Sequence, residues 1–355
     1  MADPRERLFA PALISTLFPH LPPMRANIAR WLLIAGVALA LGVALGRYVP
    51  IALALGAALL PILYLAYFYD VEVYEDEPVP ILAGTFVAGA ALGAALSLAF
   101  YRTLIGQRPL GLHVGLPIGY VALNALLLPL LSQALMLAGP VALYLFFRRR
   151  SRFEDILDGL VFGAASGLGF AAAQSIVYAW QLLAGPLQRG GGAFDWTLPT
   201  LRVTLLTPLL YAASTGLICA ALWLRRDPHV RQRPPTLATS LPFAIVAAAL
   251  GLILPSLLTD FVPGQTLSFL WYLLAAVALL LLARVSLHIG LLEKGAETVE
   301  GITDADLIVC PTCQRLTADL AFCSQCGVAL RANSKRRRAR RPPELPGDAT
   351  EGERQ

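Results

Sequence analysis

Residues 148–180 read RRRSRFEDILDGLVFGAASGLGFAAAQSIVYAW, and this stretch guides the interpretation of the whole chain. A basic cluster and a short acidic turn come first. The sequence then stays apolar for long enough to cross a bilayer as a helix. Gly159, Gly163 and Gly167 recur every four residues, so they share one face of that helix. A helix face without side chains lets another helix approach closely, as helices do in lipid, and we predict close helix packing there.

The composition indicates a polytopic membrane protein. Hydrophobic residues make up 57% of the 355 residues and charged residues only 14%, whereas soluble domains average about 25% charged residues. Abundant alanine and a preference for arginine over lysine hint at a bacterial protein. Four of the five cysteines lie together near the C-terminus, which does not match a secreted disulfide framework.

Eight apolar runs of about 17–25 residues predict about eight transmembrane helices. They lie at 31–46, 51–69, 79–101, within 114–147, and at 159–184, 200–224, 241–262 and 266–283. The fourth run is ambiguous, because 114–147 would be about 50 Å long as one helix and contains Pro117, Pro129 and Pro140. We interpret it as one kinked span with a re-entrant or interfacial lead-in. Two spans would give nine in total and invert the upstream topology.

The positions of the basic residues predict that both termini are cytoplasmic. With eight spans, 23 of the 28 Lys and Arg residues fall on one side of the membrane. The segments on that side are 1–30, 70–78, 148–158, 225–240 and the C-terminal tail. Because cytoplasmic loops carry the excess of Lys and Arg, we assign this side to the cytoplasm and the protein to the inner cell membrane. The nine-span alternative would move only the basic residues of the N-terminus to the other side.

The chain divides into four predicted parts. Residues 1–30 form a cytoplasmic N-terminal segment, and residues 31–290 form the membrane domain. Residues 303–331 form a separate small unit, and residues 332–355 form a tail of disordered composition. Residues 25–46 are not expected to be a cleaved signal peptide, because the run is long and another span follows at once.

The small unit has the cysteine spacing of a zinc site. It contains Cys310-x-x-Cys313 and Cys323-x-x-Cys326, with nine residues between the two pairs. Two such knuckles close a tetrahedron of thiolates around Zn²⁺, and a site with four protein ligands is structural. We therefore predict a zinc ribbon. Redox dithiols are the alternative, without a thioredoxin-like pattern to support them, and the fifth thiol, Cys219, is predicted to be a packing residue.

A run of basic residues follows the predicted ribbon. It consists of Lys335, Arg336, Arg337, Arg338, Arg340 and Arg341. We expect these side chains to bind anionic lipid headgroups on the cytoplasmic leaflet, at about 1 kcal/mol for each basic residue. RNA is the alternative ligand, but no aromatic-rich nucleic-acid module accompanies the run. Membrane lipids, and not nucleic acid, are thus the expected partners.

The membrane domain also resembles a known family over about residues 64–224. The segments that carry the resemblance are YFYDVEVYEDEPVPIL, the basic cluster with DGLVFGAASGLGFAAAQSIVYAW, and TPLLYAASTGLICAAL. They are similar to the PrsW-type intramembrane metalloproteases, which are related to the CAAX-processing glutamate proteases. The resemblance implies an all-α membrane fold that surrounds a metal-dependent hydrolytic site.

The resemblance also implies where catalytic residues should lie. Such proteases carry two adjacent glutamates with a lysine three residues later, a glutamate four residues after a phenylalanine, and a histidine ahead of a threonine. These residues supply the metal ligands and the general base. The matching positions of this chain hold Ser132, Gln133, Met136, Gln174 and Tyr211. Every position at which the family places a catalytic group is therefore substituted.

The residues themselves lead to the same expectation. Metal-dependent hydrolysis needs anionic or imidazole ligands and a general base. The four histidines lie at or beyond the ends of the predicted spans, and no Asp or Glu lies well inside one. Ser132 has no His or Lys at its depth to activate it as a nucleophile. We therefore predict that the membrane domain is a non-catalytic, protease-like module.

Two interpretations of the substituted positions remain open. Their polar groups form either a neutral network between helices, at about 0.6 kcal/mol per hydrogen bond in lipid, or a retained cavity that binds a peptide, a lipid or another membrane protein. An active metalloprotease with displaced ligands is the alternative function. A transporter or channel is a third class, which the absence of intramembrane charges disfavours.

Overall fold

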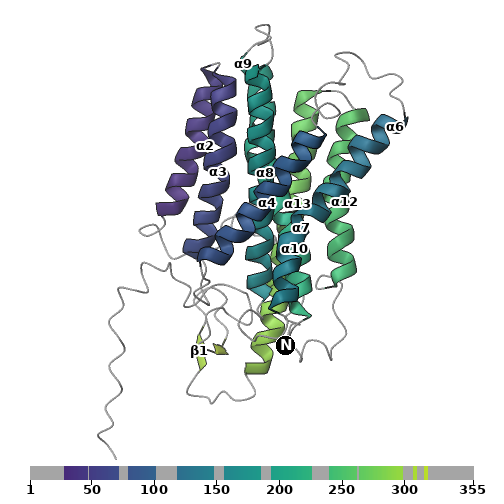
Figure 1. Cartoon of the computed structure of the whole chain (residues 1–355). Helices are drawn as coiled ribbons and strands as arrows, with labels where there is room; N and C mark the ends of the chain where they lie inside the picture. Colours follow the sequence, from purple (N-terminus) through teal and green to yellow (C-terminus); the bar gives the residue numbers. More distant parts are fainter. Residues whose placement is uncertain are drawn as a thin grey trace, which may run out of the picture.

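A computed structural model describes most of the membrane domain and two short strands. The described residues are 28–46, 48–71, 79–100, 118–147, 156–184, 193–225, 240–261, 264–298, 307–309 and 316–318. Within these ranges the protein is a bundle of long helices, with a small sheet beyond one end of the bundle (Figure 1).

The helices follow the predicted apolar segments closely. In chain order they are α2 (Ile28–Leu45), α3 (Val49–Val71), α4 (Val79–Ala99), α6 (Ile118–Val121), η2 (Ala122–Leu127), α7 (Leu128–Phe146), α8 (Ile156–Ala184), α9 (Ala193–Leu201), η3 (Arg202–Leu206), α10 (Thr207–Leu224), α12 (Leu241–Phe261) and α13 (Gln265–Thr298). Two of these elements, η2 and η3, are π-helical turns that continue directly into α7 and α10.

The all-helical membrane fold is confirmed. Six helical segments of the described chain are long and apolar enough to cross a membrane. In α2 and α3 the described apolar stretches are shorter, at Ile34–Leu45 and Ala54–Tyr64. The total of eight spans therefore stays a prediction.

Helices α8 and α10 form the centre of the bundle. In α8, 78% of the membrane-spanning stretch is buried within the protein, and the value for the span that contains α10 is 72%. The other four spans are only 22–33% buried. Their outer faces expose large apolar side chains such as Val87, Leu98 and Val246, as expected of surfaces that face lipid tails. Figure 1 shows α8 between the α2–α3 pair on one side and α12 and α13 on the other.

The ambiguous fourth segment is one continuous helical stretch over residues 118–146. Its π-helical turn ends just before Pro129. Proline has no N–H, and its ring crowds the carbonyl four residues earlier, which a wider turn accommodates. The same combination recurs where η3 precedes Pro208. Pro140 lies inside α7 without ending it.

The central helix begins earlier than the predicted span, which starts at residue 159. Helix α8 begins at Ile156, so Asp158 lies in its first turn and is buried, at 2% exposure. A carboxylate near a helix N-terminus is favoured by the partial positive charge of the unpaired N–H groups.

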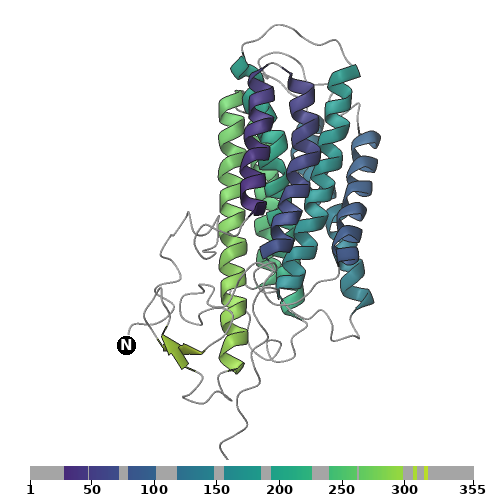
Figure 2. The same cartoon turned by 90° about the vertical axis from the view of Figure 1, so that its left-hand side faces the viewer.

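The two strands form an antiparallel hairpin beyond the membrane bundle. Strand β1 (Leu307–Val309) pairs with β2 (Leu316–Ala318), and Ile308 lies opposite Thr317. Figure 2 shows α13 extending past the other helices toward this hairpin. The four predicted zinc ligands and the basic run at 335–341 lie outside the described residues.

Candidate functional site

The glycine face of α8 lies directly against the backbone of α10. A Cβ atom added to Gly163 would lie 2.7 Å from the carbonyl oxygen of Thr215, and one added to Gly167 would lie 2.6 Å from that of Tyr211. Gly159 makes a similar approach one turn earlier in α8, to a carbonyl one turn later in α10. The two helices are therefore antiparallel and in backbone contact, because no side chain separates them.

A second helix packs just as closely on another face of α8. Glycines of α4 make this approach, since a Cβ at Gly93 would lie 2.5 Å from the carbonyl oxygen of Phe170, and Gly89 meets the backbone of Ser166. In the opposite direction, Gly169 of α8 meets the carbonyl of Phe86. Helix α8 is thus held from two sides at backbone distance.

Helix α7 brings three of the predicted positions to the junction of α8 and α10. Ser132, Gln133 and Met136 are buried there, with exposures of 4%, 6% and 0%. Ser166 Oγ of α8 donates a hydrogen bond to the carbonyl oxygen of Met136 at 2.7 Å. Gln133 Nε2 donates to Thr215 Oγ1 of α10 at 3.4 Å, and this hydroxyl donates to Met136 Sδ at 3.6 Å. Neutral polar groups thus connect all three helices.

One atom of this network lacks a partner. Gln133 Oε1 is buried and accepts no hydrogen bond from any residue that the structure describes. A buried acceptor without a donor costs about 1–3 kcal/mol. The junction can therefore accept one further donor, such as a water molecule or an N–H group.

Tyr211 and Gln174 extend the site along α10 and α8. Tyr211 lies one turn before Thr215, and its ring contacts that of Phe170 edge-on, with centroids 5.9 Å apart. Gln174 is half-buried and lies one turn after Phe170. Among the described residues, no hydrogen bond links Gln174 to Gln133 or Tyr211. The structure thus connects the α7 residues to Thr215, places Tyr211 beside them, and leaves Gln174 unlinked.

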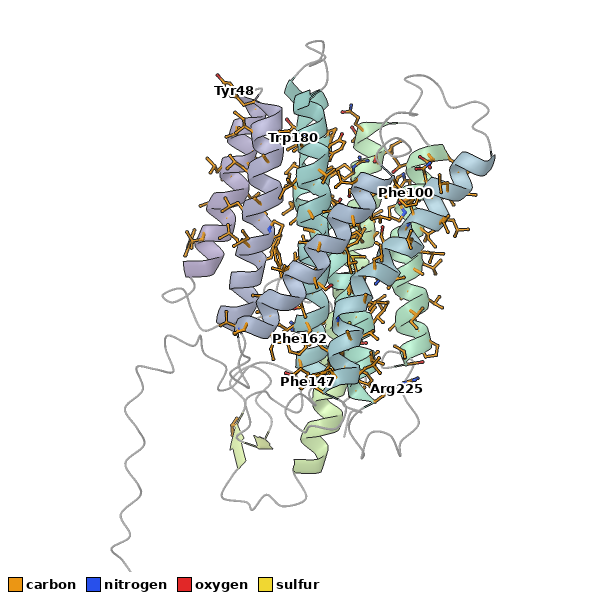
Figure 3. The ribbon with its side chains drawn as sticks, viewed as in Figure 1. Tyr48, Phe100, Phe147, Phe162, Trp180 and Arg225 are labelled. Carbon is orange, nitrogen blue, oxygen red and sulfur yellow. The ribbon has the colours of Figure 1, made fainter. Side chains whose placement is uncertain are left out.

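Aromatic side chains pack the bundle below this junction. The Trp223 ring contacts Tyr144 of α7, with centroids 5.1 Å apart, and Phe162 of α8, with centroids 6.1 Å apart. Figure 3 shows Phe162 and Phe147 toward the lower end of the bundle, where Arg225 follows α10, and Trp180 in the upper half. The lower end of α7, α8 and α10 is therefore apolar and closely packed.

The side chains at the junction are not the ligands that a catalytic metal requires. Proteins bind Zn²⁺ through Cys sulfur, His nitrogen or carboxylate oxygen, and no group of three or more such residues lies together in the described part of the chain. The junction offers an amide, hydroxyl groups and a thioether. We therefore derive no hydrolytic step through a metal for these residues.

The sequence of these helices matches a known family. The family model of the PrsW family intramembrane metalloproteases matches residues 77–283, which is more than half of the chain. The chain belongs to the PrsW family. The match begins just before α4 and ends within α13, so it starts later and extends further toward the C-terminus than the predicted region of about 64–224. Searches of curated proteins and of solved structures each gave no match.

Two residues of the PrsW region that connect helices were missed in the sequence. Ser166 and Thr215 supply the hydroxyl groups that link α8 and α10 to α7. Serine and threonine are common in membrane helices, where they often bond to their own backbone. The available signal was position, because Ser166 lies within the glycine-rich run and Thr215 lies one turn after Tyr211.

Proposed function

We propose that this PrsW-family protein is a membrane-embedded binding or scaffold module that does not cleave peptide bonds. The observation that carries the proposal is the network of Gln133, Thr215 and Met136. Gln133 and Met136 stand at two of the positions where the family resemblance implies charged catalytic groups, and Thr215 lies one turn after a third, Tyr211. The proposed ligand is a segment of another membrane protein or a peptide, because the donor and acceptor groups at the junction are uncharged and suit a neutral backbone.

The chemistry of the substituted side chains supports this proposal. A metal-bound water becomes a strong nucleophile at neutral pH only where ligands hold the metal. Gln133 has the shape of a glutamate, but its amide has no charge and cannot take up a proton as a general base. Met136 cannot supply the positive charge of the lysine that the family carries at this position.

Active proteolysis is the second candidate function. It is favoured by the family match itself, since the matched family consists of intramembrane metalloproteases. An active site would then use ligands other than Ser132, Gln133, Gln174 and Tyr211.

We further propose that a cytoplasmic zinc ribbon is attached to the membrane domain. Its support is the order of elements, because β1 ends directly before Cys310 and β2 begins at Leu316, so the first knuckle lies between the two strands. The ribbon would bind one structural Zn²⁺ through its four cysteines. The basic run after it would bind anionic lipid on the same side of the membrane.

Restoring the family residues tests the proposed function. The background is the full chain with Cys310→Ser and Cys323→Ser, which removes the predicted ribbon site. The restored variant carries Ser132→Glu, Gln133→Glu, Gln174→Glu and Tyr211→His. We expect it to bind one additional metal ion per chain, measured as metal content of the protein purified in detergent. The matched control carries Ser132→Gln and Tyr211→Phe and should gain no metal.

The outcomes separate the two candidate functions. No gain of metal in the restored variant would show that the four positions do not converge, and the residue-by-residue assignment would be wrong. Chelator-sensitive cleavage of a membrane-protein substrate by the unmodified protein would establish the protease instead. The proposed function requires that the unmodified protein show no such cleavage.

A further inference from the structure

A single arginine is held in place at the end of the bundle where α12 turns into α13. Arg202, the first residue of η3, donates a hydrogen bond from Nη1 to Ser268 Oγ of α13 at 2.6 Å. Its guanidinium also lies over the ring of Tyr272, 5.2 Å from the centroid. Ser268 is 4% exposed and Arg202 is half-buried. Two side chains of α13 therefore fix the position of this charge.

The hydroxyl groups beside Arg202 donate their hydrogen bonds to α12. Thr259 Oγ1 donates to the carbonyl oxygen of Pro255 at 2.7 Å, so its oxygen must accept in its contact of 3.1 Å with Ser268. A hydroxyl carries one proton, and Ser268 therefore donates to Thr259 and accepts from Arg202. The hydrogen bonds run in one direction, from the guanidinium to the backbone of α12.

The second contact of Arg202 follows the same pattern. Ser256 Oγ donates to the carbonyl oxygen of Leu252 at 3.0 Å, so the Tyr272 hydroxyl donates to Ser256 across 3.4 Å. Both residues that contact the guanidinium are thus anchored to α12. They orient Arg202 without offering it an acceptor that carries negative charge.

No carboxylate in the described part of the chain bonds to the guanidinium of Arg202, although Asp260 directly follows Thr259 in α12. The side-chain interactions of Arg202 there are its bond to Ser268 and its stacking on Tyr272, and neither involves a carboxylate. A guanidinium has five N–H donors, of which Ser268 accepts one. Charged groups in membrane proteins are costly without a partner. The remaining donors are therefore open to an anion from outside the described part of the chain.

The depth of the site indicates which anion. Thr259 lies two residues before the end of α12, and Ser268 lies three residues after the start of α13. At 1.5 Å per residue, both are within about 5 Å of the helix ends, and we expect the lipid headgroups at the ends of the spans. This end of α13 is opposite the β1 hairpin (Figure 2). We propose that Arg202 binds the phosphate group of a membrane phospholipid, whose oxygens match the fork of a guanidinium.

Thermal unfolding of the full chain in neutral detergent tests this site. Three additives are compared: a short-chain phosphatidylglycerol, a diacylglycerol with the same chains, and inorganic phosphate. We expect the phospholipid to raise Tm more than the diacylglycerol does. Arg202→Gln should raise the half-saturating phospholipid concentration at least tenfold, whereas Arg225→Gln, at the opposite end of the bundle (Figure 3), should leave it unchanged.

Two further variants keep the test decisive if Arg202→Gln does not fold. Arg202→Lys retains the charge and loses the fork, and Ser268→Ala retains the guanidinium and releases it, so both should weaken the phospholipid response several-fold. An equal response in these variants and the unmodified protein would overturn the site. A diacylglycerol that raises Tm as much as the phospholipid would exclude recognition of phosphate. If inorganic phosphate raised Tm as much as the phospholipid does, the site would be one for free phosphate and the proposed lipid ligand would be wrong.

Discussion

At the scale of single residues, Gln133 shows how a membrane protein can retain a polar site without charge. Its amide is 6% exposed, donates to Thr215 and leaves its own oxygen without a partner. A glutamate here would need a cation or a proton to remain buried. The amide needs neither, and the neighbouring Met136 and Thr215 are correspondingly neutral.

The Gln133–Thr215 hydrogen bond should contribute measurably to stability. Thr215→Val keeps the shape of the side chain and removes its hydroxyl, so we expect the free energy of unfolding to fall by about 1 kcal/mol, within the range of such bonds in membranes. Thr215→Ser retains the hydroxyl and should cost less. Unfolding by a denaturing detergent in mixed micelles measures the difference.

A double-mutant cycle isolates this bond from the packing of the methyl groups. In a Gln133→Leu background, Thr215→Val should cost less than in the unmodified protein, because the bonded amide is already absent. Equal costs in the two backgrounds would mean that the contact of 3.4 Å contributes no stability.

At the scale of helices, the glycine pattern predicts a closely packed face of α8 but does not identify the helix that packs on it. The spacing of Gly159, Gly163 and Gly167 predicts a face without side chains, and the structure places α10 on it. The spacing alone could not identify α10, because any helix can pack on a bare face. The contact of Gly93 with α8 was missed, since glycines of α4 are separated from α8 by about 70 residues of sequence.

The π-helical turns were also beyond prediction from the sequence. Pro129 indicates a disturbed helix, but a kink, a break and a wider turn can each accommodate a residue without an N–H. The choice depends on tertiary contacts. In η3, for example, the wider turn lets Thr207 Oγ1 donate to the carbonyl of Arg202 at 3.0 Å, while the side chain of Arg202 bonds to Ser268.

A methyl group on the α8–α10 contact should destabilise the bundle. In Gly167→Ala the new Cβ would meet the Tyr211 carbonyl oxygen at 2.6 Å. Because the neighbouring atoms belong to the backbone of α10, a change of side-chain rotamer cannot remove this clash. Overpacking of this kind costs about 1–3 kcal/mol. Gly84→Ala in α4 is the matched control, because nothing lies within 4 Å of its new Cβ. Tm in detergent should fall for the first variant and not for the second.

The difference in Tm between these two variants decides whether the helices are in contact. A Gly167→Ala protein as stable as Gly84→Ala would show that α8 and α10 are not in backbone contact.

At the scale of the whole molecule, the PrsW region is extended by helices that precede it. The family match begins at residue 77, so α2 and α3 lie outside it. Leu60 and Tyr64 of α3 nevertheless pack against Ala164 and Leu168 of α8 in a buried cluster. The central helix is thus covered by α3 as well as by α4, α7 and α10.

The ends of the helices group the loops on two sides. Phe147, which directly follows α7, and Arg225, which directly follows α10, lie at the lower end of the bundle in Figure 3. The basic segments 148–158 and 225–240 therefore begin at the same end, toward which α13 also extends (Figure 2). The sequence predicts that this end faces the cytoplasm, since the two segments concentrate arginine.

Reporter fusions test this orientation and the central span together. A reporter fused after Arg150 should be cytoplasmic, and one fused after Gly190 should lie on the other side, because α8 is a single helix between them. A fusion after Arg233 should behave like the one after Arg150, since α9, η3 and α10 cross back. Matching signals from the Arg150 and Gly190 fusions would contradict the assignment of α8 as a span. Opposite signals with the Arg150 fusion outside would keep the bundle and reverse its orientation, and the proposed lipid site of Arg202 would then lie in the cytoplasmic leaflet.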